Sequence, residues 1–107
     1  MTLSQFATIL NSSGLPVRYG YWTDEDRPTV PYIEYACTYT ENFGSDNKVH
    51  QVIQHIDVFL FTKEKNLTAE AAVEGVFDAN EIFWNKTESY FEDERVYQIL
   101  YEVSIYG

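Results

Sequence analysis

Two histidines and a nearby aspartate are the first residues in this chain whose types could do chemistry. His55 and Asp57 stand two positions apart, so in an extended strand their side chains share one face about 7 Å apart. A metal ion could use both, but the sequence offers no third ligand and neither an HExxH motif nor a paired Cys–His spacing. His50 falls at the opposite parity and belongs to a polar segment. We expect His55 and Asp57 to be hydrogen-bonded sheet residues, and we expect no metal site.

The other reactive residue types also lack suitable partners. Cys37 is the only cysteine; it excludes an internal disulfide and, without a nearby base, is interpreted as a small core residue. The acidic pairs Asp24 with Asp26 and Glu92 with Glu94 could hold a hard cation, but they fall in expected exposed turns. Glycine-rich phosphate loops are missing from the sequence. We therefore expect no catalytic residues and no cofactor.

The charge balance restricts the classes of partner. Seven basic and 17 acidic residues give a formal net charge of −10. A nucleic-acid groove and adhesion to anionic membranes both need clustered Lys and Arg, so both are disfavoured. An acidic surface can keep a protein soluble, repel DNA that passes nearby, or mimic DNA. The first residues lack a signal-peptide pattern, and no apolar run reaches the roughly 20 residues of a membrane span.

Length and composition indicate one folded domain. The 107 residues leave room for a single domain, which we assign to residues 1–107. A content of 45% hydrophobic and 17% aromatic residues excludes intrinsic disorder and favours strands. The lone cysteine suits a reducing cytosol.

Two helices are predicted. Residues 2–13 have apolar positions at helical spacing, and Thr2 followed by Gln5 fits a capping box. Gly14 suits a left-handed helix end. The second helix is expected at residues 68–79, with Asn66 or Thr68 as its N-cap.

Five strands are predicted, at residues 17–22, 32–40, 52–62, 82–91 and 95–106. In the last strand the apolar residues share one face, which should fix its register. These are Tyr97, Ile99, Tyr101, Val103 and Ile105. Alternation in the second strand places Ile33, Tyr35, Cys37 and Tyr39 together. The third strand is partly apolar on both faces, so we expect it to be central and covered twice. The order α-β-β-β-α-β-β predicts an α+β domain with a mainly antiparallel sheet and two helices packed on it.

A polar segment at residues 41–51 connects the second and third strands. It is expected to be a protruding hairpin tip that is too long for a tight two-residue turn. Phe43 lies in this polar segment, and exposure to solvent does not explain a large apolar residue at this position. Trp22 and Trp84 stand near strand ends, where aromatic residues either cap a core or anchor an interface. We expect subunit or partner contacts at Asn42, Phe43, Gly44, Asp46, Trp22 and Trp84.

Several short sequence segments in the expected strands and loops carry a family resemblance. They are GLPV at 14–17, YGYW at 19–22, PYIEY at 31–35, YTENF at 39–43, residues 54–63, and YQILYE at 97–102. With these segments the chain resembles the small tail-terminator, or tail-completion, proteins of long-tailed (siphovirus) phages and prophages of Gram-positive bacteria. The resemblance covers most of the chain and includes no catalytic motif.

The resemblance implies a non-enzymatic assembly protein. Such proteins form a homo-oligomeric ring, commonly a hexamer, that terminates the tail tube and joins it to the head connector. The implied partners are further copies of the chain, the major tail tube protein and a head-completion or connector protein. The implied location is the tail–head junction of the virion, after synthesis in the host bacterial cytoplasm. DNA would pass through the ring without specific binding, and an acidic wall suits this because phosphates find no cations there.

Two alternatives remain beside this interpretation. A head-completion or connector protein is the nearest rival within the same setting. From a different class, an acidic inhibitor that mimics DNA would space its carboxylates like phosphates over one face. Here the acidic residues are scattered over turns and over both expected sheet faces, which counts against a mimic. An unrecognised enzyme is the least favoured class.

Overall fold

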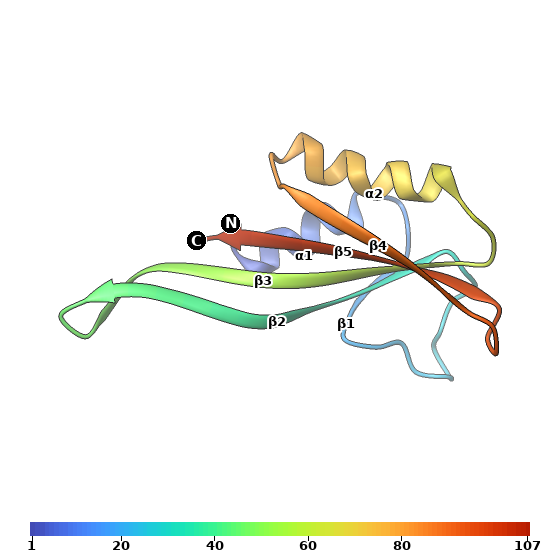
Figure 1. The fold of residues 1–107 in the computed structure, drawn as a ribbon, viewed down its shortest axis with the longest axis horizontal. Helices are drawn as coiled ribbons and strands as arrows, with labels where there is room; N and C mark the ends of the chain where they lie inside the picture. Colours follow the sequence, from blue (N-terminus) through green and yellow to red (C-terminus); the bar gives the residue numbers. More distant parts are fainter.

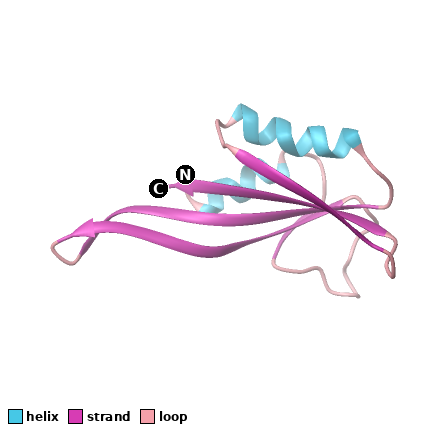
Figure 2. Ribbon diagram, in the orientation of Figure 1, coloured by secondary structure: helices cyan, strands magenta, loops and turns pink.

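The computed structural model describes the backbone of residues 1–107 and every side chain except that of His50. Its elements are α1 (Leu3–Asn11), β1 (Val17–Tyr19), β2 (Tyr32–Ser45), β3 (Lys48–Thr62), α2 (Leu67–Ala79), β4 (Trp84–Phe91) and β5 (Val96–Tyr106). This order, shown in Figure 1 and Figure 2, confirms the predicted α+β class and element sequence.

The five strands form one sheet in the order β1-β2-β3-β5-β4. Only the β1–β2 pair is parallel, and the other three neighbouring pairs are antiparallel. β3 is therefore central, as predicted. Both helices pack on the same face of the sheet, and we call the opposite side the open face (Figure 1).

The core lies between the helices and the covered face. Phe6 and Leu10 of α1 and Val73 and Phe77 of α2 are fully buried against the sheet. The predicted apolar face of β5 is confirmed, because Ile99, Tyr101, Val103 and Ile105 are buried there. Each fully buried large apolar side chain contributes roughly 1.5–3 kcal/mol relative to an exposed one. This burial fixes the register of the central strands.

We expected both faces of β3 to be covered, by helices or by another subunit, and within the chain no helix covers the open face. It carries instead a row of aromatic rings that starts at the loop before β2. Trp22 lies 6.5 Å from Tyr32, Tyr32 lies 5.2 Å from Phe61, and Phe61 lies 6.4 Å from Phe59, measured between ring centroids. The apolar positions on both faces of β3 therefore reflect helices on one side and aromatic packing on the other.

Local signals place the helix ends. The Thr2 hydroxyl accepts a hydrogen bond from the Gln5 N–H at 3.1 Å, and the Gln5 side chain accepts one from the Thr2 N–H at 2.8 Å. This confirms the predicted capping box, a type of cap that contributes about 1 kcal/mol. α1 ends at Asn11, two residues before the predicted end, and Gly14 has a left-handed φ of 84°. None of the helices in the described part of the chain is long and apolar enough to cross a membrane.

The β2–β3 hairpin has a tighter turn than predicted. Most of residues 41–51 belong to the paired strands, and only Asp46 and Asn47 lie between Ser45 and Lys48. Both turn residues have left-handed φ values, 54° and 63°, as a two-residue type I′ turn requires. The expectation of a long loop was wrong because Asp and Asn adopt this conformation without a glycine.

Tyr39 lies on the opposite face from the predicted one. The ladder pairs Cys37 with Ile56 but Tyr39 with His55, so Thr38 is an extra residue in a β-bulge. The bulge reverses the alternation of the strand beyond it. Tyr39 consequently joins His55 on the open face instead of the covered face with Cys37.

The first strand is shorter than the predicted range of 17–22. β1 ends at Tyr19, because Gly20 takes a left-handed φ of 83° and turns the chain away. At the other end of the sheet, β2 and β3 extend past the end of β5, whose last pairing joins Tyr106 to Ile53. We call residues 41–53 the arm and residues 43–49 the arm tip. The arm gives the molecule its elongated extents of 51 × 28 × 22 Å (Figure 1).

Candidate functional site

Four of the six expected contact residues meet at the arm tip or next to it. Asn42, Phe43, Gly44 and Asp46 are all exposed there. Phe43 pairs with Gln51 in the ladder and remains 50% exposed. Figure 1 shows the tip well away from both helices. An exposed aromatic ring on a projecting hairpin is a feature of contact surfaces.

Gly44 shapes the arm tip. A Cβ atom added at this position would lie 1.8 Å from the carbonyl oxygen of Lys48. The ladder also shifts register between Phe43 and Gly44, so the two strands approach closely at an irregular point. The presentation of Phe43 therefore depends on a glycine in the next position.

Trp22 and Trp84 do not join this surface, because each is half-buried in contacts of its own. The Trp22 N–H donates to the Glu34 carboxylate at 2.8 Å, and its indole donates to the Ile33 carbonyl at 3.2 Å. The Trp84 indole donates to Asp78 at 2.9 Å, and its ring packs on Tyr101. Both tryptophans hold loops and helices onto the sheet.

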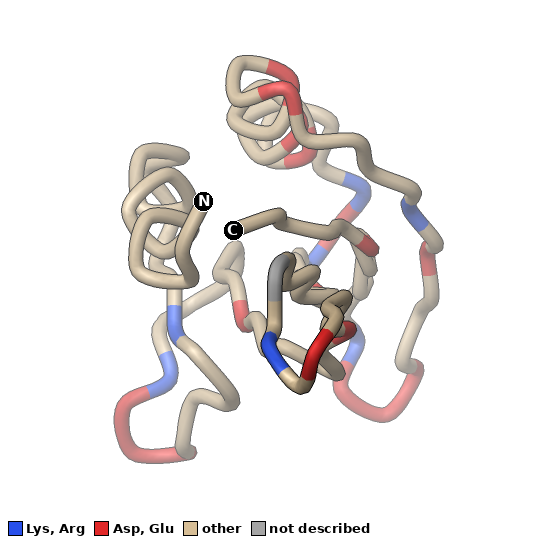
Figure 3. The backbone as a smooth tube through the Cα atoms, turned by 90° about the vertical axis from the view of Figure 1, so that its left-hand side faces the viewer, with Lys and Arg blue, Asp and Glu red and all other residues tan. Residues whose placement is uncertain are grey.

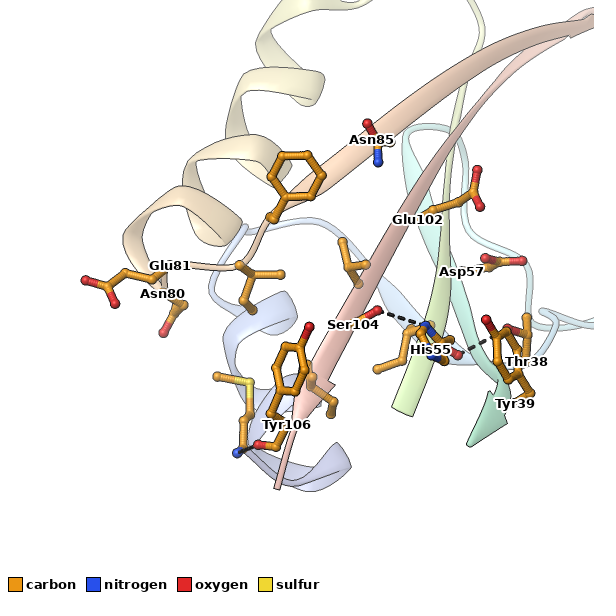
Figure 4. A pocket seen from close by; sticks show the side chains of 16 residues that line it. Thr38, Tyr39, His55, Asp57, Asn80, Glu81, Asn85, Glu102, Ser104 and Tyr106 are labelled. Carbon is orange, nitrogen blue, oxygen red and sulfur yellow. Dashed lines mark hydrogen bonds between the residues drawn. The ribbon is translucent and has the colours of Figure 1, made fainter. Parts of the chain in front are cut away.

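A histidine cluster lies on the open face near the base of the arm. His55 Nε2 lies 2.5 Å from Glu41 Oε1, and His55 Nδ1 lies 2.9 Å from Ser104 Oγ. The Tyr39 ring stacks on the imidazole with centroids 4.2 Å apart. Figure 4 shows the bond to Ser104 and the bond from the Thr38 hydroxyl to the His55 carbonyl. The cluster joins β2, β3 and β5.

The order of hydroxyl, imidazole and carboxylate in this cluster also occurs in nucleophilic sites. In this chain the hydroxyl, imidazole and carboxylate come from three neighbouring strands, and the Tyr39 ring stacks on one face of the imidazole. The arrangement holds the three strands together at the point where the Thr38 bulge breaks the ladder. His55 is thus hydrogen-bonded, as predicted; the side chain of His50 lies outside the described residues.

Asp57 differs from His55 because no described group donates a hydrogen bond to its carboxylate. It pairs directly across the ladder from Glu102, also on the open face. Burial raises the pKa of the Asp57 carboxyl, and the nearby Glu102 carboxylate raises it further. Two carboxylates in directly opposed positions repel each other. Asp57 is therefore a paired sheet residue, as expected, whose carboxylate faces another carboxylate.

A cavity of about 480 Å³ opens beside these residues. Its lining comes from the base of the arm, the end of β5 and the segment before β4, as Figure 4 shows. β4 begins at Trp84 opposite Val103, so residues 104–106 of β5 have no strand beside them on that edge. Glu102, Asp57 and Glu81 bring carboxylates to the lining. The cavity is therefore an acidic recess at a free strand edge.

A second polar cluster fixes α2 to β4 and β5. The Glu70 carboxylate is almost fully buried and forms salt bridges with Lys65 at 2.8 Å and with Lys86 at 3.0 Å. Glu74 accepts hydrogen bonds from Lys86 at 2.8 Å and from the Tyr101 hydroxyl at 2.6 Å. Burial alone raises the pKa of Glu70, but the two lysines outweigh it, so the pKa is below its usual value. Sequence reasoning missed this cluster because its residues come from separate segments.

Three of the other candidate residues have structural contacts, and the acidic pair Glu92 and Glu94 is exposed, as expected. Asp26 pairs with Arg18 at 2.7 Å, and Asp24 pairs with Arg27 at 3.0 Å. Cys37 packs against the edge of the core. Among the described side chains, no group of three His, Cys, Asp or Glu residues is arranged to hold a metal ion.

Comparison with known proteins shows a similar fold. No protein-family model and no curated protein matches the chain. A chain of the virion of native gene transfer agent (GTA) particle matches with a TM-score of 0.60 and 15% sequence identity. The match covers 98% of this chain and 89% of that chain. At this identity the similarity shows that the two chains share a fold.

Proposed function

We propose that residues 1–107 act as one domain of a non-enzymatic virion protein that forms a ring, terminates a phage tail tube and joins it to the head connector. The observation that carries the proposal is the match, over 98% of the chain, to a chain of a gene transfer agent virion. A shared fold alone does not assign a function. The arm and the charge distribution supply the other two arguments.

The shape of the chain suits assembly into a ring. A closed ring needs a head-to-tail contact between two different surfaces of each subunit. The projecting arm offers one such surface, with the exposed Phe43 and Asp46 near its end. The outer strand β4 and the free end of β5 offer others, because unpaired strand edges readily accept another chain. The subunit number that this proposal favours is six, as in the family that the sequence resembles.

The charge suits a ring through which DNA passes. A formal charge of −10 gives phosphates few cations to bind. Figure 3 shows acidic residues on α2, on separate loops and near the arm tip, not on one continuous face. This distribution favours a surface that repels DNA over a surface that mimics it. The proposed partners are the tail tube protein and a head-completion or connector protein, at the tail–head junction of a virion assembled in a bacterial cytoplasm.

Electron microscopy and light scattering of the purified chain, alone and with purified tail tubes, test the proposal. We expect rings, formed in solution or only on contact with a tube, that cap one end of each tube. Binding to connectors without binding to tubes would favour the head-completion alternative. Monomers in both conditions would contradict the ring.

A further inference from the structure

The charge of the chain limits how copies can meet. Each copy carries a formal net charge of −10, so cations at an interface would reduce the repulsion between copies. Four basic side chains are already in ion pairs within the subunit: Arg18, Arg27, Lys65 and Lys86. Lys48, Lys63 and Arg95 have no acidic partner among the described side chains. Of these three, only Lys48 lies on the arm.

The arm tip combines this free cation with apolar groups. Lys48 follows the two-residue turn directly and is exposed. Val49 is 59% exposed, and Phe43 is 50% exposed. A cation flanked by apolar side chains at a projecting end fits a recess that is acidic and partly apolar.

The cavity beside the end of β5 is such a recess. Its lining includes the acidic residues Asp57, Glu81 and Glu102 and no Lys or Arg residue. The Met1 amine also reaches it, but this amine donates to the Tyr106 carbonyl. Phe83 in the lining is 79% exposed and Tyr106 is 57% exposed, so aromatic groups border the carboxylates.

A subunit cannot fill this recess with its own arm tip. The recess lies at the base of the arm, and the hairpin runs away from the end of β5 (Figure 1). Any tip that enters must come from another molecule. Tip and recess are different surfaces, so their contact is heterologous and can repeat from copy to copy until a ring closes.

We propose that the arm tip of one copy docks in the acidic recess of the next copy. Lys48 then lies against the opposed carboxylates of Asp57 and Glu102, and Phe43 and Val49 lie against the aromatic border. The inference rests on the proposed ring and names its subunit contact. The Lys48 ammonium of the neighbouring copy would also offset the repulsion between these two carboxylates.

Charge reversal in the full-length chain tests the contact. Lys48→Glu and Glu102→Lys are each expected to weaken self-association about tenfold or more, because each places like charges opposite one another. The double variant restores the pairing in reverse and should recover most of the association. Sedimentation velocity measures the change in solution, or binding to tail tubes measures it if rings form only there.

Matched controls separate a local pairing from net charge. Lys63→Glu and Glu92→Lys make the same charge changes at exposed positions outside the arm tip and the recess. They should change association less than twofold, and circular dichroism should show all variants folded. Equal effects at Lys48 and Lys63, or a double variant no better than the singles, would overturn the inference while leaving a wild-type ring intact. If wild-type protein stays monomeric even with tail tubes, the ring and this contact both fail.

Disulfide trapping gives an independent readout. In a Cys37→Ser background, Val49→Cys, which keeps Lys48 in place, is made in one preparation and Asn85→Cys, which lines the recess, in another. Oxidation should produce a dimer that joins the two variants when they are mixed. Heterodimers no more abundant than those of a Val49→Cys and Glu92→Cys mixture would overturn the proposed contact.

Discussion

At the scale of single residues, His55 shows how one side chain can hold a weakened ladder together. It lies beside the Thr38 bulge, where the pairing of β2 and β3 changes register. Its two nitrogens and its ring face contact groups on two neighbouring strands. The spacing of His55 and Asp57 predicted a shared face, but the partners Glu41 and Ser104 were not predictable. They come from strands whose register is set by the whole sheet.

His55→Ala is expected to lower the free energy of unfolding by about 1–3 kcal/mol, because Glu41 and Ser104 lose their shared partner. Urea denaturation followed by fluorescence measures this. Thr87→Ala, an exposed change on β4, should leave the free energy of unfolding within about 0.5 kcal/mol of wild type. Equal midpoints for the His55 and Thr87 variants would contradict a structural role for the cluster.

Gly44→Ala is expected to disturb the arm tip, because the added Cβ meets the Lys48 carbonyl oxygen at 1.8 Å. Amide chemical shifts should change over residues 43–49 and stay constant in α2. The matched control is Gly75→Ala, where an added Cβ meets nothing within 4 Å. This helical change should stabilise the protein by about 0.5–1 kcal/mol. Unchanged shifts at the tip would contradict the close approach of the two strands at Gly44.

At the scale of elements, α2 is fixed by charge as well as by apolar packing. Glu70 is a buried acid in a helix whose apolar residues alone would predict its orientation. Lys65 comes from the preceding loop and Lys86 from β4, so both hold the helix across the sheet edge. A partly buried pair of this kind is costly to break from one side.

Glu70→Gln is expected to lower the free energy of unfolding by about 1–3 kcal/mol at pH 7, because Lys65 and Lys86 lose their charged partner. The lowered pKa of Glu70 means that its contribution is complete above its unfolded value of 4.5 and falls as pH drops through the folded value. The difference from wild type should therefore shrink in acid. Urea titrations at pH 7 and pH 3.5 measure it, with the exposed Glu64→Gln as control. A difference that grows in acid would contradict the assignment.

The elements themselves were largely predictable, and their irregularities were not. The alternation in β5 gave its covered face correctly, because every second residue from Ile99 to Ile105 is apolar. The Thr38 bulge has no glycine or proline to mark it. The Asp46–Asn47 turn was not predicted because it lacks the glycine that usually marks a two-residue turn. Both features depend on how the two strands pair, which a single segment does not specify.

At the scale of the molecule, the helix-covered body and the projecting arm are separate parts of one sheet. The body holds the buried core, whereas most of the arm extends past the last β3–β5 pairing, which joins Ile53 to Tyr106. Stability therefore depends mainly on the body. Under the proposed function, contact between molecules depends mainly on the arm.

Phe43→Asp is expected to leave the free energy of unfolding within about 0.5 kcal/mol of wild type, since the ring is half exposed. The same change should reduce tail capping about tenfold or more, because a charge replaces an apolar contact group. Counting capped tube ends by electron microscopy measures it. Tyr21→Asp, at a residue that is 78% exposed outside the arm, is the control. Normal capping by the Phe43 variant would exclude the arm as a docking element.

The bulge at Thr38 determines on which face of the sheet each later residue of β2 lies. Side chains alternate between the two faces along a strand, and the bulge adds one residue to β2 that has no place in this alternation. If Thr38 were instead paired as a regular ladder residue, Phe43 would point to the side of the helices and Asn42 would take its place on the open face. The body could remain unchanged without the bulge, while the arm presented a different chemistry to its neighbour. The bulge at one residue thus sets which of two surfaces this protein offers.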